Sequence, residues 1–249
     1  MSRLVLAATA RGHAPAAAPP AEPLTDEARA ALRAEIRAYL MDNPEVIFEA
    51  VAEYERRAAA AQADMDVALV EVNAEAIFAD GHSWEGGNPA GDLTLVEFMD
   101  YRCGFCRRAF PGMMEFVAGD GNVRLVIKEL PILGPASEIM SRFAVAVHRQ
   151  AGNDAYFRVH ERLLELNGEP TDEVLAGIAQ DLGLEAAPIL AVMRSPEVSA
   201  ILTENRRLAQ RLQISGTPSF IMGDGTRGQM LRGMVPADQL RELADELRG

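Results

Sequence analysis

Apolar residues take on a helical spacing from Leu24 onward. Thr25 is followed by Asp26 and Glu27, a combination typical of a helix start. The apolar positions that then recur at steps of three and four are Leu32, Ile36, Tyr39 and Leu40. The pattern predicts a first helix that ends at Asp42-Asn43.

A second, longer helix is predicted from Pro44 to about Ala79, because this stretch has no internal glycine or proline and proline suits a first helical turn. Its apolar positions alternate steps of four and three, the spacing of a coiled-coil seam. The seam positions are Ile47, Val51, Tyr54, Ala58, Ala61, Met65, Ala68 and Val72. Two interpretations stay open: a helix that lies on its own domain, and a parallel oligomerisation stalk, which we favour.

Continuous apolar and β-branched runs then predict two buried strands, Leu93–Met99 and Val123–Glu129. A helical segment, Arg107 to Val117, lies between them. Strand, helix and strand form a βαβ unit, which is right-handed by the general rule. The glycine-rich stretch 86–91 before the first strand reads as a loop, and we interpret His82, Trp84 and Glu85 there as surface packing.

A helical block follows the second strand. Its predicted helices are Ser137–Ala151, Asp154–Asn167, Thr171–Leu182 and Glu185–Leu212, the last one broken near Ser195-Pro196. Sheet character returns at Ser219–Met222, and a glycine-rich loop leads to Gln229–Arg232, which together predict a hairpin. A helix from Pro236 to Arg248 closes the chain. We interpret His148 and His160, within the block, as ordinary helix residues.

Charge and composition narrow the class of protein. The 249 residues carry 24 basic and 37 acidic side chains, so the net charge is −13, and this excludes a nucleic-acid-binding surface. No segment has the apolar length that a membrane span requires. Met1–Ala10 is at the lower edge for a secretory signal, and a start codon assigned too late would explain its shortness. The Ala/Pro tract from Arg11 to Pro23 predicts a flexible linker.

Both cysteines of the chain, Cys103 and Cys106, lie between the first strand and the helix after it, with two residues between them. This position places the first sulfur at a helix N-terminus, where unpaired N–H groups and the helix dipole favour the thiolate. Thiolate is the attacking species in disulfide exchange, so a redox dithiol is indicated. A structural disulfide would close a very small loop, and the four histidines are not at ligand spacing for zinc. A two-coordinate thiolate metal site stays open.

A second motif, Gly216-Thr217-Pro218-Ser219-Phe220, places a proline at the start of a strand. X-Pro bonds are the main place where cis peptides occur. The alternative is a trans proline that caps an edge strand.

Together these motifs resemble the thioredoxin fold: Glu97-Phe98, Cys103-Gly104-Phe105-Cys106, Pro111 and Gly216-Thr217-Pro218-Ser219-Phe220. The helical block resembles the DsbA-type insertion. With Asp42-Asn43-Pro44-Glu45-Val46 in the N-terminal helices, the chain resembles the ScsC-like proteins of suppression of copper sensitivity. The resemblance covers about Leu24 to the C-terminus.

The resemblance implies an α/β fold with a helical domain inserted between βαβ and ββα halves, preceded by a long helical arm. The implied division is 1–23 as signal and linker, 24–80 as oligomerisation arm, and 81–249 as DsbA-like domain with the insertion at about 136–213.

The resemblance also implies roles for site residues. Cys103 attacks and forms a mixed disulfide, and Cys106 resolves it. Pro218 is cis, near the sulfurs, and the Thr217 backbone pairs with bound polypeptide. Glu97 takes the proton of Cys106, the alternative being an ordinary solvent-facing strand residue.

The Gly104-Phe105 dipeptide is closer to the bacterial isomerases than to the strong oxidases. The function expected is thus a periplasmic thiol–disulfide oxidoreductase, chiefly an isomerase, acting on unfolded or misoxidised proteins and served by a membrane thiol reductase or oxidase. Residues 44–79 supply a route to homo-oligomers.

Three other functions stay open: a dithiol oxidase of DsbA type, a Cu(I)-binding copper-tolerance protein that uses Cys103 and Cys106, and an oligomeric chaperone-like scaffold. Apart from Cu(I), no cofactor is expected.

Overall fold

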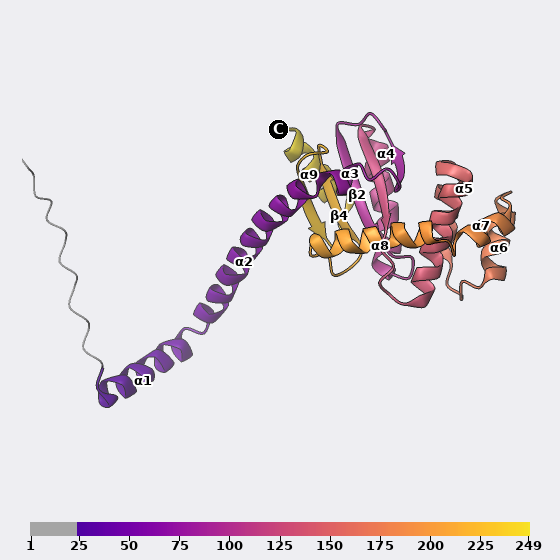
Figure 1. Cartoon of the computed structure of the whole chain (residues 1–249). Coiled ribbons are helices and arrows are strands. Elements are labelled where there is room, and N and C mark those ends of the chain that lie inside the picture. The colour runs from indigo at the N-terminus through magenta and orange to yellow at the C-terminus, as the bar shows by residue number, and fades with distance from the viewer. Residues whose placement is uncertain (1–23) are drawn as a thin grey trace, which may run out of the picture. The chain divides into compact units, whose positions relative to one another are not determined.

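The computed structural model describes residues 24–249 (Figure 1), so the signal and linker predicted at 1–23 lie outside the described residues. The chain divides into two compact units, one that ends at Arg56 and one from Arg57 to Gly249. Within 24–249 no helix combines the length and apolarity needed to cross a bilayer.

Two helices predicted at the start of the arm are confirmed. α1 (Asp26–Asp42) begins where the Thr25 hydroxyl accepts a hydrogen bond from the Ala28 N–H at 3.2 Å, a side-chain N-cap. It ends where the Asn43 side chain donates to the Tyr39 carbonyl at 2.9 Å. α2 (Glu45–Val72) follows directly.

The predicted seam of α2 is open to solvent. Ile47 and Val51 are 50% and 49% exposed, and Tyr54 is 73% exposed. Leu32 and Ile36 on α1 are also about half exposed. These apolar side chains are available to a partner surface, and the oligomerisation arm stays a prediction.

The second predicted helix is shorter than expected. It breaks at Asn73, and a separate short helix, α3 (Ala74–Phe78), follows. Asn73 donates from its side chain to the Leu69 carbonyl at 2.8 Å and accepts from Arg211 Nε at 2.7 Å. An asparagine that bonds backbone and a distant side chain in this way competes with helix continuation.

The sheet has five strands in the order β1-β3-β2-β4-β5. They are β1 (Trp84–Gly87), β2 (Leu93–Met99), β3 (Val123–Glu129), β4 (Ser219–Gly223) and β5 (Gly228–Arg232). β2 and β3 are parallel and are joined through α4 (Gly104–Asp120), which confirms the βαβ prediction. β4 pairs antiparallel with β2 and with β5, which confirms the hairpin.

The surface-packing interpretation is wrong for Trp84, and the first two residues of the predicted loop, Gly86 and Gly87, belong to a strand. Trp84 begins β1, which pairs antiparallel with β3, and its side chain is only 6% exposed. The indole stacks on Tyr156 and Phe157 and donates to the Asn153 carbonyl at 2.9 Å. A four-residue segment with two glycines has no alternation of apolar and polar residues that would predict a strand. It forms a strand because it pairs with the edge of β3.

The helical insertion lies between β3 and β4, as predicted. Its helices are α5 (Pro135–Glu165), α6 (Asp172–Asp181), α7 (Ala186–Val192) and α8 (Pro196–Arg211). α5 combines two predicted helices across Gly152, whose φ of 82° interrupts the helical backbone. Figure 1 shows α5, α6 and α7 grouped beside the sheet, and α9 (Ala237–Arg248) near the end of the chain.

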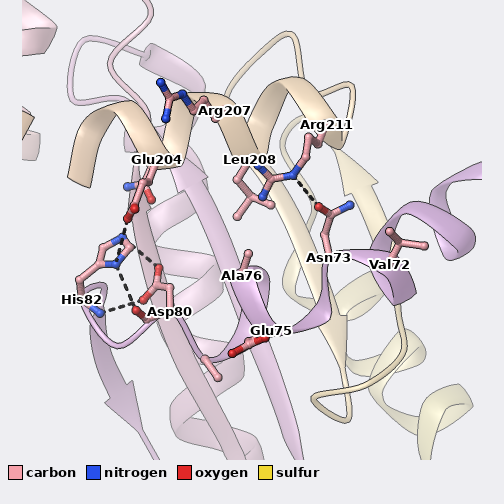
Figure 2. Close-up of a pocket in the computed structure, with 12 residues that line it drawn as sticks. Val72, Asn73, Glu75, Ala76, Asp80, His82, Glu204, Arg207, Leu208 and Arg211 are labelled. Atoms are coloured by element: carbon pink, nitrogen blue, oxygen red, sulfur yellow. Dashed lines mark hydrogen bonds and ion pairs between the residues drawn. The ribbon is translucent and has the colours of Figure 1, made fainter. Parts of the chain in front are cut away.

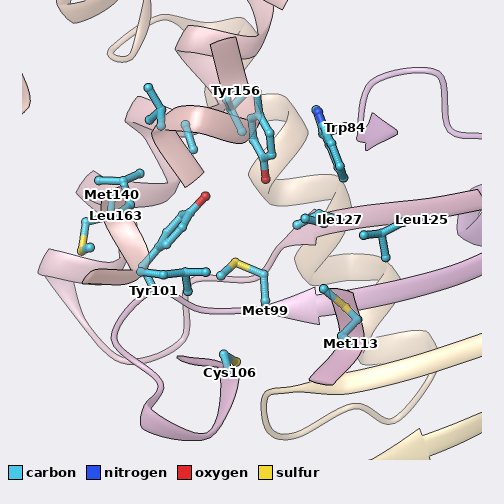
Figure 3. Close-up of a cluster of buried hydrophobic side chains, with 14 of the residues drawn as sticks. Trp84, Met99, Tyr101, Cys106, Met113, Leu125, Ile127, Met140, Tyr156 and Leu163 are labelled. Carbon is cyan, nitrogen blue, oxygen red and sulfur yellow. The ribbon is translucent and has the colours of Figure 1, made fainter. Parts of the chain in front are cut away.

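Alternate strand residues face two separate cores. On one face, Leu95 and Met99 of β2 pack in a cluster that includes residues of α4, α5 and α9 (Figure 3). On the other face, Val96 and Phe98 pack with residues of α3 and α8. Every residue of β2 is buried, so a polar side chain on this strand is forced into a core.

Candidate active site

The two cysteines lie at the start of α4. Cys103 is the N-cap residue, with extended backbone at φ −77° and ψ 112°, and Cys106 lies one turn into the helix. Both are buried free thiols, 6% and 1% exposed. The position of the first sulfur at a helix N-terminus is therefore confirmed.

Asp100 holds the loop that leads into Cys103. One carboxylate oxygen accepts from the Arg102 N–H at 2.8 Å, and the other accepts from the N–H groups of Ile132 and Leu133 at 2.8 and 3.0 Å. These bonds connect the Cys103 loop to the segment after β3. The loop is thus anchored by a fully buried carboxylate that the sequence did not single out.

The Thr217-Pro218 peptide bond is cis, as predicted, and it faces the first cysteine. The Cys103 Sγ–H donates to the Thr217 carbonyl oxygen at 3.1 Å. A cavity of about 170 Å³ lies beside this contact and is lined by the cis peptide and its neighbours. Its lining residues are Ser215, Gly216, Thr217, Pro218, Ser219, Arg232 and Gly233.

The two thiols differ in acidity. Burial opposes ionisation of Cys103, but hydrogen bonds from the Thr217 side chain and from the Cys106 and Phe105 backbones prevail and lower its pKa. Burial raises the pKa of Cys106, and the Glu97 carboxylate raises it further. The pair therefore combines one activated sulfur with one that holds its proton.

Glu97 is buried on β2, 2% exposed, so the alternative of a solvent-facing strand residue is wrong. Burial, followed by the charges of Glu129 and Cys103, raises its pKa to about 8. Glu97 acts electrostatically on both cysteines. A carboxyl group with this pKa can exchange a proton with a thiol near neutral pH.

The sequence pattern did not predict the buried polar cluster around Glu129. Tyr101 and Tyr156 both donate to Glu129 Oε1, at 2.8 and 2.6 Å, and Ser141 donates to Oε2 at 2.8 Å. Figure 3 shows the two tyrosine hydroxyls pointing toward one another. His160, interpreted from the sequence as an ordinary helix residue, has Nδ1 2.9 Å from the Tyr101 hydroxyl. The only sequence signal was an acidic residue at the end of an otherwise buried strand.

The dipeptide between the cysteines is open to solvent. Phe105 is 55% exposed, and the Arg108 guanidinium stacks over its ring at 4.5 Å from the centroid. A Cβ on Gly104 would lie 3.5 Å from Arg108 Nη1. Ile132, Leu133 and Met234 are other exposed large apolar residues, 42%, 52% and 47% exposed.

A separate cavity of about 520 Å³ lies between α3 and α8 and contains no cysteine (Figure 2). His82 lines it between Asp80 and Glu204, at 3.3 and 3.7 Å from their carboxylates. Asp80 also pairs with Lys128, whose side chain is fully buried. Within residues 24–249, no cluster of three or more His, Cys, Asp or Glu side chains could hold a metal ion.

Comparison with protein families gives two matches. The family model described as the DSBA-like thioredoxin domain matches residues 94–248, more than half of the chain. The model described as the copper resistance protein ScsC N-terminal domain matches residues 29–61, which cover α1 from Arg29 onward and the first part of α2.

Solved structures agree with this fold. A thioredoxin-like oxidoreductase from Silicibacter pomeroyi is 37% identical, with a TM-score of 0.63 over 70% of this chain and 96% of that one. A periplasmic thioredoxin-like protein from Salmonella enterica is 28% identical, with a TM-score of 0.61 over 70% of this chain and 95% of that one. The α/β thioredoxin-like DsbA fold with a helical insertion and N-terminal helices is thereby established.

The first of the curated relatives is much longer than this chain. The Na(+)/H(+) antiporter NhaA 1 of Salinispora arenicola is 27% identical over 132 residues, which are 52% of this chain and 20% of the antiporter. The chain thus spans about a fifth of the length of that relative.

Proposed function

The chain belongs to the DSBA-like thioredoxin-domain family of thiol–disulfide oxidoreductases, and from that premise we propose that it acts in the periplasm chiefly as a protein disulfide isomerase. One observation carries this proposal: the Cys103 thiol, with a lowered pKa, lies 3.1 Å from the Thr217 carbonyl beside a cis proline. The periplasmic assignment rests on the likeness to the Salmonella protein.

The proposed reaction begins with the Cys103 thiolate. It attacks one sulfur of a substrate disulfide, and the substrate's other sulfur leaves as a thiolate with the electron pair of the broken bond. In isomerisation, a substrate thiolate attacks a second substrate disulfide, and the last thiolate formed attacks the mixed disulfide and releases Cys103. No net oxidation or reduction occurs, so the protein has to start in the dithiol form.

Cys106 can also break the mixed disulfide, in place of a substrate thiolate. Its thiol gives the proton to the Glu97 carboxylate, attacks Cys103 Sγ, and expels the substrate sulfur as a thiolate. The protein is then oxidised and the substrate reduced. The electrostatic coupling between Glu97 and Cys106 supports this proton transfer.

We assign substrate binding to Thr217, Pro218, Gly104 and Phe105. An extended polypeptide beside the Thr217 backbone can add as a strand, while Phe105, exposed next to the reactive sulfur, provides apolar contact. This arrangement suits unfolded or misoxidised proteins, which expose both backbone and apolar side chains.

The isomerase direction is supported by the Gly104-Phe105 dipeptide and by the arm. The solvent-exposed seam within 44–79 provides a surface for a homo-oligomer, in which two or more dithiols hold one substrate. A membrane thiol reductase has to keep Cys103 reduced. If a membrane oxidase serves the protein instead, the same site works as a dithiol oxidase.

Recovery of activity from scrambled ribonuclease tests the isomerase proposal. We expect the full chain to restore ribonuclease activity, the Cys103→Ala variant to lose this ability, and Cys106→Ala to retain part of it. The exposed variant Glu165→Gln is the matched control and leaves the rate unchanged. Oxidase or reductase activity without unscrambling would contradict the assignment.

Cu(I) binding is a second candidate function, favoured by the match of residues 29–61 to the copper resistance protein ScsC N-terminal domain. Two thiolates, Cys103 and Cys106, fit the soft-ligand preference of Cu(I). Titration of the reduced protein with Cu(I) should give stoichiometric binding that disappears in the double Cys→Ser variant. Absence of uptake by the reduced protein would exclude this function.

A further inference from the structure

Glu129 is a buried carboxylate whose hydrogen-bond donors favour its charged form. It is 3% exposed, and three hydroxyl groups, from Tyr101, Tyr156 and Ser141, donate to its two oxygens. An ionised carboxylate accepts hydrogen bonds and donates none, so it satisfies all three donors at once. The Tyr101 hydroxyl donates its single proton to Glu129, so its oxygen can only accept a hydrogen bond from His160. Neutral His160 therefore donates from Nδ1 to the Tyr101 oxygen.

The cluster is connected to the reactive loop through Tyr101. This residue lies two positions before Cys103 and is fully buried. Its hydroxyl bonds to Glu129, and its carbonyl accepts from Arg107 Nε on α4 at 3.0 Å. Arg107 in turn donates to the Leu166 carbonyl at 2.8 Å. The backbone that enters Cys103 is thereby held between the sheet and the insertion.

The cluster is also adjacent to Glu97. Glu97 pairs with Ile127 and Met99 pairs with Glu129 in the parallel β2–β3 ladder. Side chains two residues apart on a strand share a face, so the two carboxyl groups point to the same side of the sheet. Two carboxylates in one buried region raise each other's proton affinity.

We propose that Glu129 is a positioning residue for proton transfer to Glu97: its hydroxyl-bound carboxylate places a negative charge beside Glu97 and holds Tyr101 at the entry to Cys103. The inference rests on the proposed dithiol chemistry and deepens it. Glu129 touches neither sulfur and acts through Glu97 and Tyr101.

The chemical step that Glu129 assists is resolution by Cys106. The Cys106 proton moves to the Glu97 carboxylate, the Cys106–Cys103 bond forms, and the bond between Cys103 and the bound sulfur breaks. The electron pair leaves with the departing thiolate. A negative charge beside Glu97 makes it a stronger base, closer in proton affinity to a thiol, which favours the transfer.

Several other ionisable groups act on this cluster. Burial raises the pKa of Glu129 to about 7, although the hydrogen bonds from Tyr156, Ser141 and Tyr101 act in the opposite direction. Asp100 raises it further. His160 is neutral, since burial lowers its pKa to about 3. The ionisable groups of the surroundings, by element, are Glu97 on β2, Asp100 and Tyr101 before α4, Cys103 and Cys106 at α4, His148, Tyr156 and His160 on α5, and His82 before β1.

The pH dependence of the Cys106 step tests the inference. The reduced full chain is mixed with dithiobis-nitrobenzoate, and the release of the second nitrothiobenzoate reports attack by Cys106 on the Cys103 mixed disulfide. We expect the wild-type release rate to rise with pH, with an inflection at the pKa of Glu97. We expect Glu97→Gln to abolish that inflection. Glu129→Gln should move the inflection to lower pH by about half a unit to one unit, because the neighbouring charge is lost.

Asp80→Asn is the matched control. It also removes a partly buried carboxylate, but one that pairs with Lys128 away from the dithiol, so stability falls while the inflection stays in place. If Glu129→Gln does not fold, Tyr156→Phe decides the question, since loss of one donor weakens the Glu129 charge and produces a smaller shift in the same direction.

An unchanged inflection in a folded Glu129→Gln variant, or in Tyr156→Phe if that variant has to decide, would overturn the inference. This outcome is distinct from a failure of the proposed function. A protein that reacts normally with the reagent but does not repair scrambled ribonuclease refutes isomerisation and leaves the role of Glu129 standing.

Discussion

The sulfur of Cys103 lies 3.1 Å from the carbonyl oxygen of Thr217, although the two residues are 114 positions apart in the chain. The whole helical insertion lies between them in sequence. The sheet brings them together because β4, which follows Thr217, pairs directly with β2, which leads to Cys103.

The Thr217 side chain, as distinct from its carbonyl group, should help to set the acidity of Cys103. We expect the Cys103 thiol to titrate below an ordinary cysteine, and Thr217→Val to raise its pKa because the side-chain hydrogen bond is lost. Thr217→Ser is the control and should leave the pKa near the wild-type value. Thiolate absorbance against pH, measured in a Cys106→Ser background, reports Cys103 alone. Equal values in all three proteins would contradict this account.

Stability should fall as pH rises, on account of Glu97. Its pKa is about 8 in the folded chain against 4.5 ordinarily, so the folded state keeps a proton that the unfolded state loses. The stabilisation is complete below about pH 4.5 and disappears as pH rises through about 8. In the wild type, we expect Glu97 to lower the free energy of unfolding by on the order of 2–4 kcal/mol between about pH 4.5 and about pH 8. In Glu97→Gln this decrease should be absent.

Denaturant unfolding at several pH values measures this effect, with the fluorescence of the single tryptophan, Trp84, as the probe. Trp84 is buried in the same core as the residues of α4 and α5, so its signal follows the unit that contains Glu97. The exposed Glu165→Gln control should keep the wild-type slope. An identical slope in Glu97→Gln would show that Glu97 is not the titrating group.

The Asp80–Lys128 pair should be costly to break. Lys128 is fully buried and pairs with Asp80, whose pKa is lowered to about 2: burial opposes this, and the charge and hydrogen bond of Lys128 prevail. Asp80→Asn leaves a buried ammonium without its counter-charge, so we expect a loss of about 3–5 kcal/mol in the free energy of unfolding. Lys128→Met in the same chain should recover part of the loss. If Asp80→Asn unfolds like the wild type, the pair contributes little.

The exposed seam of α2 should carry self-association. We expect the full chain to exceed the monomer mass in light scattering, and Val51→Asp to reduce the mass per particle, because a charge in an apolar seam is unfavourable. Glu49→Lys, exposed on another face of α2, should leave the mass unchanged. The dithiobis-nitrobenzoate reaction should be the same in all three proteins. A monomeric wild-type chain would contradict the stalk.

Local pattern was sufficient for much of the fold. The runs Leu93–Met99 and Val123–Glu129 coincide with β2 and β3, because a strand buried on both faces needs an unbroken apolar run. The arm and the insertion helices were readable from spacing and from caps such as Thr25 and Thr171. The same local logic located the dithiol at a helix start, and the resemblance to the thioredoxin fold marked Pro218 as a candidate cis proline.

Other features depended on residues far away in sequence. β1 is a strand only because Trp84–Gly87 meets the edge of β3, and α2 breaks at Asn73, whose side-chain oxygen accepts a hydrogen bond from Arg211, 138 positions later in the chain. Neither feature produces a periodic pattern in its own segment, because the stabilising contacts come from β3 in one case and from Arg211 in the other.

The sequence by itself determined the reactive sulfurs, the order of the elements apart from α3 and β1, and the apolar seam of the arm, since each is a property of neighbouring residues. Only the tertiary structure decided that Glu97 and Glu129 share one buried face, that Tyr101, Tyr156 and Ser141 surround the second carboxylate, and that Thr217 meets Cys103. The physical reason is that the pKa of a buried group depends on burial and on nearby charges, and both are created when distant segments pack together.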